Sequence, residues 1–322
     1  MKALTQDRYG TSDVLEVRDI ERPEPGENQV LVRVVAAGID RGAWHLMTGE
    51  PYLMRLLGFG LRAPKVAVPG TSFAGVVEAV GPGVTTLKAG DEVYGATRGT
   101  FAEYAVASVD KVALKPSQLS FEEAAVLPYP TFAALQALRD HGHVQPGQRV
   151  LVVGASGAVG TIAVQLAVAF GATVTGVCSA RNVDLVRSLG AADVFDYTNE
   201  DFADGSHHYD VILDIGGATS VARLRKALDR KGTLVIVGGE GDRWVGGLQR
   251  QLWATALSTL VPQKLTVVVA KENTADLVTM SELVAAGKVA PKLEQTFPLA
   301  EGVAAVAAFE AGDAAGRIVI ST

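Results

Sequence analysis

The amino-acid sequence predicts an α/β protein that combines a doubly wound parallel sheet with a β-rich domain. The first observation is a buried strand over Val150–Val153, followed by a glycine turn over 154–160 and a buried helix over Thr161–Phe170. The second is the alternation of strands and helices beyond Ser120, which is typical of a parallel sheet with helices on both faces. The third is a series of short strands and turns before that residue, which favours a compact barrel-like domain.

The β-rich part contains several segments of strand character separated by turns. The segment Gln29–Ala37 has an alternating pattern and is interpreted as a strand. The turn Pro23–Gly26 precedes it, because proline and glycine favour turn conformations. The expected strands are Met1–Leu4, Leu15–Ile20, Gln29–Ala37, Gly70–Gly81, Lys88–Gly95 and Gly99–Val106.

Beyond residue 120 the expected elements alternate. A capping box at Ser120–Glu123 starts a helix. The expected strands are Val150–Val153, Ala172–Cys178, Asp193–Tyr197, Tyr209–Asp214 and Gly232–Gly239, and the expected helices are Thr161–Phe170, Asn182–Gly190 and a segment around Arg223–Leu228. From about residue 272 the order is helix, strand, helix and a final strand, which we expect to rejoin the first domain. The predicted domains are therefore 1–121 with 272–322, and an inserted nucleotide-binding domain over 122–271.

The glycine turn is the principal candidate binding element. A strand, a glycine turn and a helix present free N–H groups and the positive end of a helix dipole to a phosphate. The candidate contacts are Ala155, Ser156, Gly157, Ala158, Val159 and Gly160. The spacing Gly-x-x-Gly-x-x-Gly is by itself a weak signal, and a turn that simply needs small residues is an alternative.

The end of the second strand indicates which nucleotide would bind. A site selective for NAD has Asp or Glu there to accept from the ribose hydroxyls. Here the residues are Cys178-Ser179-Ala180-Arg181-Asn182, without an acid. Arg181 could hold a 2′-phosphate with two donors, worth about 1.5–3 kcal/mol and favouring NADPH. Alternatively, Arg181 is an exposed residue at a helix start, and Ser179 and Asn182 form only a cap.

Tyr197, just after the third strand, could cover the adenine or the phosphate, or be an ordinary packed tyrosine. After the last strand of this series, Gly238 and Gly239 would allow the main chain to approach the nicotinamide. The apolar segment Trp244–Leu260 is expected to line a cleft or to form a dimer surface.

Composition excludes several classes of function. The chain has 322 residues and a net charge of −6, which argues against nucleic acid or an anionic membrane as the main partner. Its single cysteine, Cys178, excludes an internal disulfide and a cysteine-rich zinc site. The N-terminus lacks a secretory pattern, and no apolar run is long enough to span a membrane. A cytoplasmic protein is expected.

Several motifs together resemble the zinc-free branch of the medium-chain dehydrogenase/reductase superfamily, which includes quinone oxidoreductases, zeta-crystallin and the reticulon-4-interacting-protein type. The motifs are Gly70–Gly75, Lys88–Gly95, Gly154–Gly160, Gly176–Asn182 and Gly316–Ile320. The resemblance covers essentially the whole chain. It implies a GroES-like domain, a Rossmann domain, a cleft between them and often a homodimer formed through the edge of the Rossmann sheet. Thr266–Val269 is the candidate edge strand, although it could be an internal strand.

The resemblance also implies that no metal is bound. Relatives with catalytic zinc carry Cys near Asp40, Gly-His-Glu at the position of Gly70–Ser72, and Cys near Tyr129, and this chain has none of these ligands. The adjacent His207 and His208 lie in a polar loop and are interpreted as solvated. Without zinc to polarise an alkoxide, reduction of acceptors that are already electron-poor is favoured over alcohol oxidation.

Three residues are candidates on the substrate side, and each has an alternative structural role. Asp40 could bind substrate or ribose, or cap the next helix. Tyr52 could donate to a carbonyl, as tyrosines of the family near this position are suspected of doing, or line a wall. Thr131 matches a family threonine beside the nicotinamide amide, or is simply a threonine at a helix N-terminus.

The predicted function is that of an NADPH-dependent, zinc-independent oxidoreductase that transfers hydride to a quinone or another electron-poor carbonyl or alkene. A 2-enal or enoyl reductase of the same superfamily is the alternative within enzymes. An NADPH-binding protein without useful turnover is the alternative of another class. The partners expected are a small quinone, enal or enone substrate and a second copy of the chain.

Overall fold

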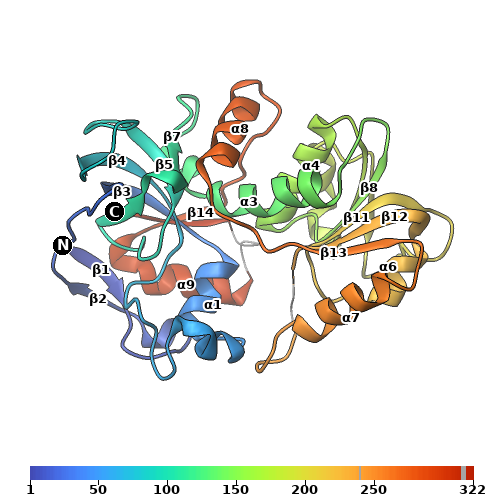
Figure 1. Ribbon diagram of the computed structural model, residues 1–322, viewed down its shortest axis with the longest axis horizontal. Helices are drawn as coiled ribbons and strands as arrows, with labels where there is room; N and C mark the ends of the chain where they lie inside the picture. Colours follow the sequence, from blue (N-terminus) through green and yellow to red (C-terminus); the bar gives the residue numbers. More distant parts are fainter. Residues whose placement is uncertain (239–240, 313–316) are drawn as a thin grey trace. The chain divides into compact units, whose positions relative to one another are not determined.

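The chain forms two compact units in a computed structural model that describes residues 1–238, 241–312 and 317–322 (Figure 1). Unit 1 consists of Met1–Tyr129 and Glu272–Thr322, and unit 2 consists of Pro130–Lys271. The segment after 271 thus belongs to the first unit. The first boundary lies eight residues later than expected, after residue 129 instead of 121.

Unit 1 is organised around one antiparallel strand, β3. It pairs with β4, β6 and β15, and Ile39 lies opposite Ile318 of the returning strand. The larger sheet has the order β14-β15-β3-β4-β5-β7, and a separate pair joins β1 and β2. The strands are β1 Lys2–Thr5, β2 Glu16–Asp19, β3 Gln29–Ile39, β4 Ser72–Val80, β5 Glu92–Ala96, β6 Tyr104–Ser108, β7 Val112–Leu114, β14 Gln295–Pro298 and β15 Ile318–Ser321.

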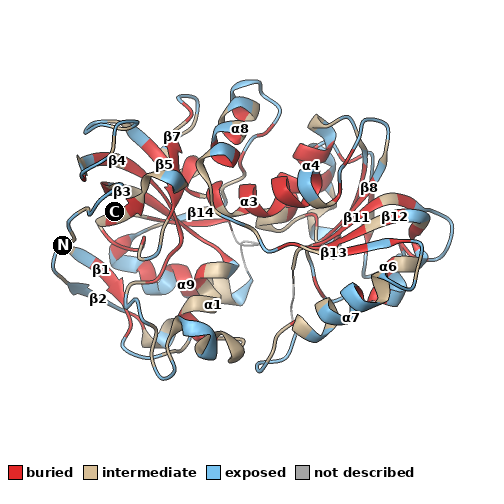
Figure 2. Ribbon diagram, in the orientation of Figure 1, coloured by how far each residue is buried: buried red, intermediate tan, exposed pale blue. Residues whose placement is uncertain are grey.

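The core of unit 1 explains why β3 is central. Val30, Val32 and Val34 belong to one cluster of buried residues with Phe73 of β4 and Ile318 of β15. In Figure 2 the red colour marks the buried parts of these strands. Alternating valines suit a pleated strand with one face in the core. The pattern that predicted a strand in the sequence is therefore the pattern that fills this core.

The helices of unit 1 include one that the sequence predicts to lie in the other domain. This is α2, which contacts β3 and β4 and begins with the predicted capping box between Ser120 and Glu123. Its buried alanines, Ala124 and Ala125, lie against the sheet of unit 1, and this is why the boundary falls later. The helices are α1 Arg41–Thr48, α2 Phe121–Ala125, α8 Thr274–Ala285 and α9 Gly302–Ala311, and α3 Pro128–Gln136 contains the boundary.

Unit 2 has the predicted doubly wound sheet. Its six strands are parallel and have the order β10-β9-β8-β11-β12-β13, so the order reverses beside β8. This is the Rossmann strand order, and ligands of such sheets bind where it reverses. The elements are β8 Arg149–Val153, α4 Ala158–Ala169, β9 Thr173–Cys178, α5 Val183–Ser188, β10 Asp193–Asp196, β11 Tyr209–Asp214, α6 Val221–Lys226, β12 Leu228–Ile236, α7 Leu248–Ser258 and β13 Lys264–Val267.

The position of β13 resolves an alternative left open by the sequence. It is the last strand in the sheet order and pairs with β12, so the expected edge strand is confirmed and an internal strand is wrong. The strand covers Lys264–Val267, two residues earlier than expected. Among the residues that the structure describes, no helix combines the length and apolarity needed to cross a membrane.

Two element boundaries differ from the sequence prediction for local reasons. Helix α4 begins at Ala158, not at Thr161, because the last glycine of the turn is already helical. Strand β5 begins at Glu92, since the residues before it form a turn in which Gly90 has a φ of +92° and the Asp91 carboxylate accepts from the main-chain N–H of Lys88. Composition alone did not reveal either boundary.

Candidate functional site

The glycine turn of unit 2 is tied to two neighbouring strands. The main-chain N–H groups of Gly154 and Ala155 both donate to the carbonyl oxygen of Val177, each at 3.0 Å. Gly154 has a φ of +88°, and a Cβ there would lie 2.9 Å from the main-chain nitrogen of Gly216. Both observations require glycine at this position. The turn is therefore fixed between β9 and the loop after β11.

The start of α4 is open to an anion. Gly157 is the N-cap and provides no side-chain cap, so helix geometry leaves the first N–H groups without intrahelical acceptors. A Cβ on Gly160 would lie 2.1 Å from the carbonyl oxygen of Gly154, so a glycine lets the helix approach the turn. The half-buried Ala158 and Val159 present no long side chain over the N-terminus. This cradle fits a phosphate group.

The end of β9 is hydrogen-bonded to the glycine turn by side chains. The Asn182 amide nitrogen donates to the hydroxyls of Ser156 at 3.2 Å and Ser179 at 3.3 Å. Neither Ser179 nor Asn182 makes a side-chain cap to the following helix, so the interpretation of these residues as only a cap is wrong. Arg181 is exposed in the same short turn. The hydroxyl of Ser179 and the amide of Asn182 thus lie beside the turn, and Arg181 lies between them in the sequence.

Two further predicted residues border this edge. Tyr197 donates its main-chain N–H to the carbonyl of Cys178 at 3.1 Å, and its side chain is 62% exposed, so the packed alternative is wrong. Gly238 donates to the carbonyl of Asp214 at 3.1 Å, and a Cβ there would lie 2.1 Å from the carbonyl oxygen of Ile215. Gly239 lies outside the described residues.

A buried ion pair at the same edge was not anticipated. Arg250 of α7 contacts the Asp214 carboxylate at the end of β11, and its Nε and Nη2 donate to the carbonyl of Thr219 at 3.1 and 2.8 Å. Burial raises the pKa of Asp214, and the charge of Arg250 opposes that effect. The pair holds the loop after β11 to α7. The only signal in the sequence is an acid that ends a predicted strand immediately before Ile215 and two glycines.

Thr131 is completely buried near the start of α3. Within the described residues its hydroxyl has no hydrogen-bond partner. A buried hydroxyl without a partner costs about 1–3 kcal/mol, so such a group is expected to meet a ligand or a water.

In unit 1, Asp40 is the centre of a buried polar cluster. Its Oδ1 accepts from the main-chain N–H of Ala43 at 2.8 Å, which caps α1, so this predicted structural role is confirmed. Its Oδ2 accepts from the hydroxyls of Thr71 at 2.5 Å and Ser72 at 3.1 Å. Residues at three positions where zinc-binding relatives carry ligands therefore bind one another.

Tyr129 completes this cluster. A Cβ on Gly42 would lie 3.0 Å from Asp40 Oδ1 and 3.1 Å from the Tyr129 ring, so the carboxylate and the ring flank the same glycine. Burial raises the pKa of Asp40, and the three hydrogen bonds above lower it in part. Burial, and then the charge of Asp40, raise the pKa of Tyr129 to about 12. In the sequence, Tyr129 is identifiable only as the position where zinc-binding relatives carry a cysteine.

Tyr52 belongs to a different group of side chains. The Arg55 guanidinium stacks on its ring at 4.5 Å and on the ring of Tyr9 at 4.3 Å. Arg55 also donates to the carbonyls of Thr48 and Gly49, which holds the segment to the end of α1. The two predicted catalytic candidates thus have separate surroundings.

Within the described residues, no three His, Cys, Asp or Glu side chains come close enough together to hold a metal ion. His207 and His208 are exposed, in agreement with their interpretation as solvated. The cluster around Asp40 consists of one carboxylate, the hydroxyls of Thr71 and Ser72, and the phenol of Tyr129. Such a set lacks the thiolate and imidazole ligands that zinc prefers.

Two protein families match this chain. Residues 26–117 match the alcohol dehydrogenase GroES-like domain, which confirms the expected character of unit 1. Residues 189–320 match the family described as zinc-binding dehydrogenase. The second match begins after the glycine turn, so that turn supports a nucleotide site independently of it.

Curated proteins and solved structures named as oxidoreductases or reductases are similar to this chain over most or all of its length. It is 37% identical over 253 residues to the 2-methylene-furan-3-one reductase of Solanum lycopersicum, covering 74% of this chain and 62% of that protein. It is 32% identical to the mitochondrial NAD(P)H oxidoreductase RTN4IP1 of Homo sapiens, covering 100% of this chain and 89% of that protein. The quinone oxidoreductase from Coxiella burnetii has a similar structure, with a TM-score of 0.87, 28% identity and coverage of 100% and 99%.

Proposed function

Because this chain belongs to the zinc-free, quinone oxidoreductase-like branch of the medium-chain dehydrogenase/reductase superfamily, we propose that it is an NADPH-dependent reductase of quinones and related electron-poor acceptors. The family is one of nicotinamide-dependent oxidoreductases. The preference for NADPH and the choice of acceptor are the parts specific to this proposal.

The end of β9 carries the argument for NADPH. None of residues 178–182 is acidic, so the end of β9 itself brings no carboxylate to a 2′-phosphate. The nearby Asp196 carboxylate of β10 accepts a hydrogen bond from the main-chain N–H of Ala180. Arg181 is exposed and can offer two parallel donors to that phosphate. The Asn182 amide, bonded to Ser156 and Ser179, supplies further polar groups beside it. A site of this composition favours the phosphorylated coenzyme.

The rest of the coenzyme has matching groups in unit 2. The N–H groups that open α4 would hold the pyrophosphate, and Tyr197 would cover the adenine. The unpartnered hydroxyl of Thr131 would bond the nicotinamide amide, and Gly238 would let the main chain approach the same ring. When bound, the nicotinamide supplies a hydride.

The cluster around Asp40 supports an acceptor that needs no metal. Both carboxylate oxygens already accept hydrogen bonds, so Asp40 serves as a fixed hydrogen-bond acceptor for the hydroxyls of Thr71 and Ser72. We propose Asp40 as a group that positions these hydroxyls, and Tyr52 as a donor to the acceptor's carbonyl. Quinones and enones accept hydride without an alkoxide intermediate that requires a Lewis acid.

A second acceptor class has its own support. The tomato relative is named as a 2-methylene-furan-3-one reductase, and its substrate contains an alkene conjugated to a carbonyl. An enone or 2-enal is therefore the alternative acceptor. In both cases hydride goes to an electron-poor carbon and a proton arrives from a side chain or from solvent.

The proposal is tested by steady-state oxidation of NADPH and NADH with 1,4-benzoquinone and with trans-2-hexenal. We expect NADPH to give the higher kcat/KM with either acceptor, and the quinone to be the better acceptor. A higher kcat/KM for the enal would favour the alternative. Tight NADPH binding without oxidation of NADPH by any acceptor would overturn the enzymatic proposal and favour a binding protein.

A homodimer formed along β13 is also proposed. This strand is an edge of the sheet, and three apolar side chains close to it in sequence are exposed: Trp253 at 61%, Leu260 at 81% and Val269 at 80%. An exposed strand edge with apolar neighbours suits association with a second copy. Light scattering should give a mass of twice 33.6 kDa, and Val269→Lys should shift it toward the monomer.

A further inference from the structure

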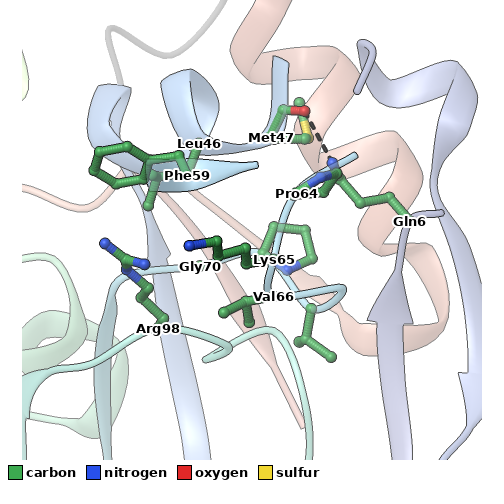
Figure 3. A pocket seen from close by; sticks show the side chains of 11 residues that line it. Gln6, Leu46, Met47, Phe59, Pro64, Lys65, Val66, Gly70 and Arg98 are labelled. Carbon is green, nitrogen blue, oxygen red and sulfur yellow. Dashed lines mark hydrogen bonds between the residues drawn. The ribbon is translucent and has the colours of Figure 1, made fainter. Parts of the chain in front are cut away.

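Unit 1 contains a pocket outside the cluster around Asp40, with two cationic side chains at its margin (Figure 3). Lys65 and Arg98 line it together with the Phe59 ring, and no acidic residue lines it. Figure 3 shows the two cationic side chains on the same side of the pocket as Phe59. The arrangement has an apolar interior and a cationic margin.

The Lys65 side of the pocket is held by a closed loop. The main-chain N–H of Lys65 donates to the carbonyl of Phe59 at 3.0 Å. The Tyr9 hydroxyl donates to the carbonyls of Phe59 at 3.1 Å and Gly60 at 2.8 Å. Gly60 has a φ of +118°, and a Cβ there would lie 2.1 Å from the carbonyl of Ala63. These contacts fix the position of the Lys65 main chain, from which its side chain extends.

The Arg98 side is held by a paired turn. The main-chain N–H groups of Thr97 and Gly99 donate to the carbonyls of Thr71 and Gly70 at 3.0 and 3.1 Å. This places the Arg98 guanidinium 4.8 Å from the centre of the Phe59 ring. Phe59 therefore links the two cations, through its carbonyl to the Lys65 main chain and through its ring to the Arg98 side chain.

The local charge is not neutralised. Both side chains are exposed, and within the described residues neither forms an ion pair or a hydrogen bond from its charged group. Residues 51–70 contain two more cations, Arg55 and Arg62, and no acid, in a chain whose net charge is −6. Two like charges at one pocket repel each other, and an anion between them removes that cost.

The interior provides an apolar wall and one unused acceptor. Leu46, Met47 and Val68 line the wall. Gln6 is 2% exposed, and its amide nitrogen donates to the carbonyl of Met47 at 2.9 Å. Its Oε1 is buried without a hydrogen-bond partner among the described residues. A buried acceptor that lines a pocket can receive a donor from a ligand or a water.

We propose that this pocket is a binding site for a small amphiphilic anion, whose carboxylate or phosphate is held by Lys65 and Arg98 and whose apolar chain occupies the space beside Phe59 and Met47. The site goes beyond the proposed reductase activity. Every residue that forms it belongs to unit 1, and its occupation requires no coenzyme. Its presence can therefore be tested separately from turnover.

The experiment is calorimetric titration of the full-length protein, without coenzyme, with hexanoate, hexyl phosphate, the neutral hexanamide and inorganic phosphate. Because each charged contact contributes about tenfold or more, we expect at least one of the amphiphilic anions to bind at least tenfold more tightly than hexanamide. It should also bind more tightly than inorganic phosphate, because the chain adds apolar contact. The tighter-binding anion shows whether the pocket prefers a carboxylate or a phosphate head group.

Variants establish the location. Lys65→Gln combined with Arg98→Gln should weaken binding of the amphiphilic anion by at least tenfold and leave hexanamide unchanged. The single variant Lys65→Gln should give part of that loss. Lys288→Gln, an exposed lysine of unit 1 outside the pocket, is the matched control and should have no effect. Thermal unfolding verifies that each variant folds.

Three outcomes would overturn the proposal. They are equal binding of hexanoate and hexanamide, an equal loss in Lys288→Gln, and tightest binding by inorganic phosphate. None of these results depends on NADPH oxidation, so a failure here leaves the proposed reductase activity untouched.

Discussion

The glycine-rich edge of unit 2 and the Asp40 cluster of unit 1 achieve specificity in opposite ways. The edge of unit 2 is made of closely packed main chain, because a Cβ at Gly154, Gly160 or Gly238 would collide with neighbouring main-chain atoms. These glycines have no side chains that could cover the main chain. The cluster in unit 1 is made of side chains that satisfy one another. The first is ready to receive a ligand's charge, and the second has already used most of its hydrogen-bonding capacity.

The comparison shows how each kind of site responds to substitution. At the edge of unit 2, adding an atom is harmful because the space belongs to the main chain or the ligand. In the cluster, removing or altering an atom is harmful because each group depends on another.

The largest effect is expected from Gly160→Ala. Its Cβ would lie 2.1 Å from the carbonyl oxygen of Gly154, and two main-chain segments cannot separate as a side chain could. We expect a loss of about 3 kcal/mol in the free energy of unfolding, measured with urea, and severe loss of NADPH binding. Gly157→Ala is the matched control for the free energy of unfolding, because a Cβ there meets its nearest protein atom at 3.6 Å. Equal losses of stability in both variants would contradict the role of close approach.

The second effect concerns Arg181→Ala. Loss of a charged contact to a 2′-phosphate should raise the dissociation constant of NADPH by about ten- to a hundredfold and leave that of NADH nearly unchanged. Arg187→Ala, an exposed arginine of α5 that pairs with Asp184, is the control. Fluorescence titration with both coenzymes measures the ratio. A similar loss of affinity for NADPH and NADH would mean that Arg181 does not contact the 2′-phosphate.

A smaller effect is expected from Tyr197→Ala. An exposed ring that stacks on adenine contributes about 1 kcal/mol, so the affinity for both coenzymes should fall about fivefold. Tyr197→Phe keeps the ring and should bind normally. Because the side chain is 62% exposed, the free energy of unfolding should not change in either variant. A fall in stability without a fall in affinity would make Tyr197 a packing residue.

The smallest effect is a change in pH dependence in Asp40→Asn. Burial raises the pKa of this carboxyl above its usual 3.8. Below pH 3.8 the Asp40 carboxyl is protonated in both the folded and the unfolded chain, so its burial carries no ionisation cost in the free energy of folding. As the pH rises the unfolded chain ionises first, so the cost to stability grows until the folded pKa is passed. Asparagine does not ionise.

The stability of Asp40→Asn relative to the wild type should therefore improve as the pH rises from about 3 to about 7. Urea denaturation at several pH values measures this difference. A constant difference would mean that Asp40 titrates equally in both states, and a decline would mean that its pKa is lowered in the folded protein.

The fold was largely predictable because its elements carry periodic apolar patterns. The valines of β3 alternate, and the strands of unit 2 are short continuous apolar runs separated by helices, so both classes of sheet were identified correctly. Helix α2 was assigned to the wrong unit, since its sequence shows a helix but not the surface on which it packs.

The sites were predictable only where a local spacing defines them. Gly154, Gly157 and Gly160 follow one another along the chain, and their turn was expected. The bond from Asn182 to Ser156 spans 26 positions, and the bonds of Asp40 to Thr71 and Ser72 span more than 30, so no local pattern encodes them. Lys65 and Arg98, which line one pocket together with Phe59, are likewise far apart in the sequence.

The sequence by itself determined the order of elements, the glycine turn, and a second strand that ends without an acid, because these depend on residues that are neighbours in the chain. Only the tertiary structure decided that Asp40 is enclosed by hydroxyls, that Arg250 pairs with Asp214, and that two cations share one pocket. The physical reason is that strand pairing and core packing bring distant residues together, and the charge and hydrogen-bonding state of a side chain depends on those neighbours.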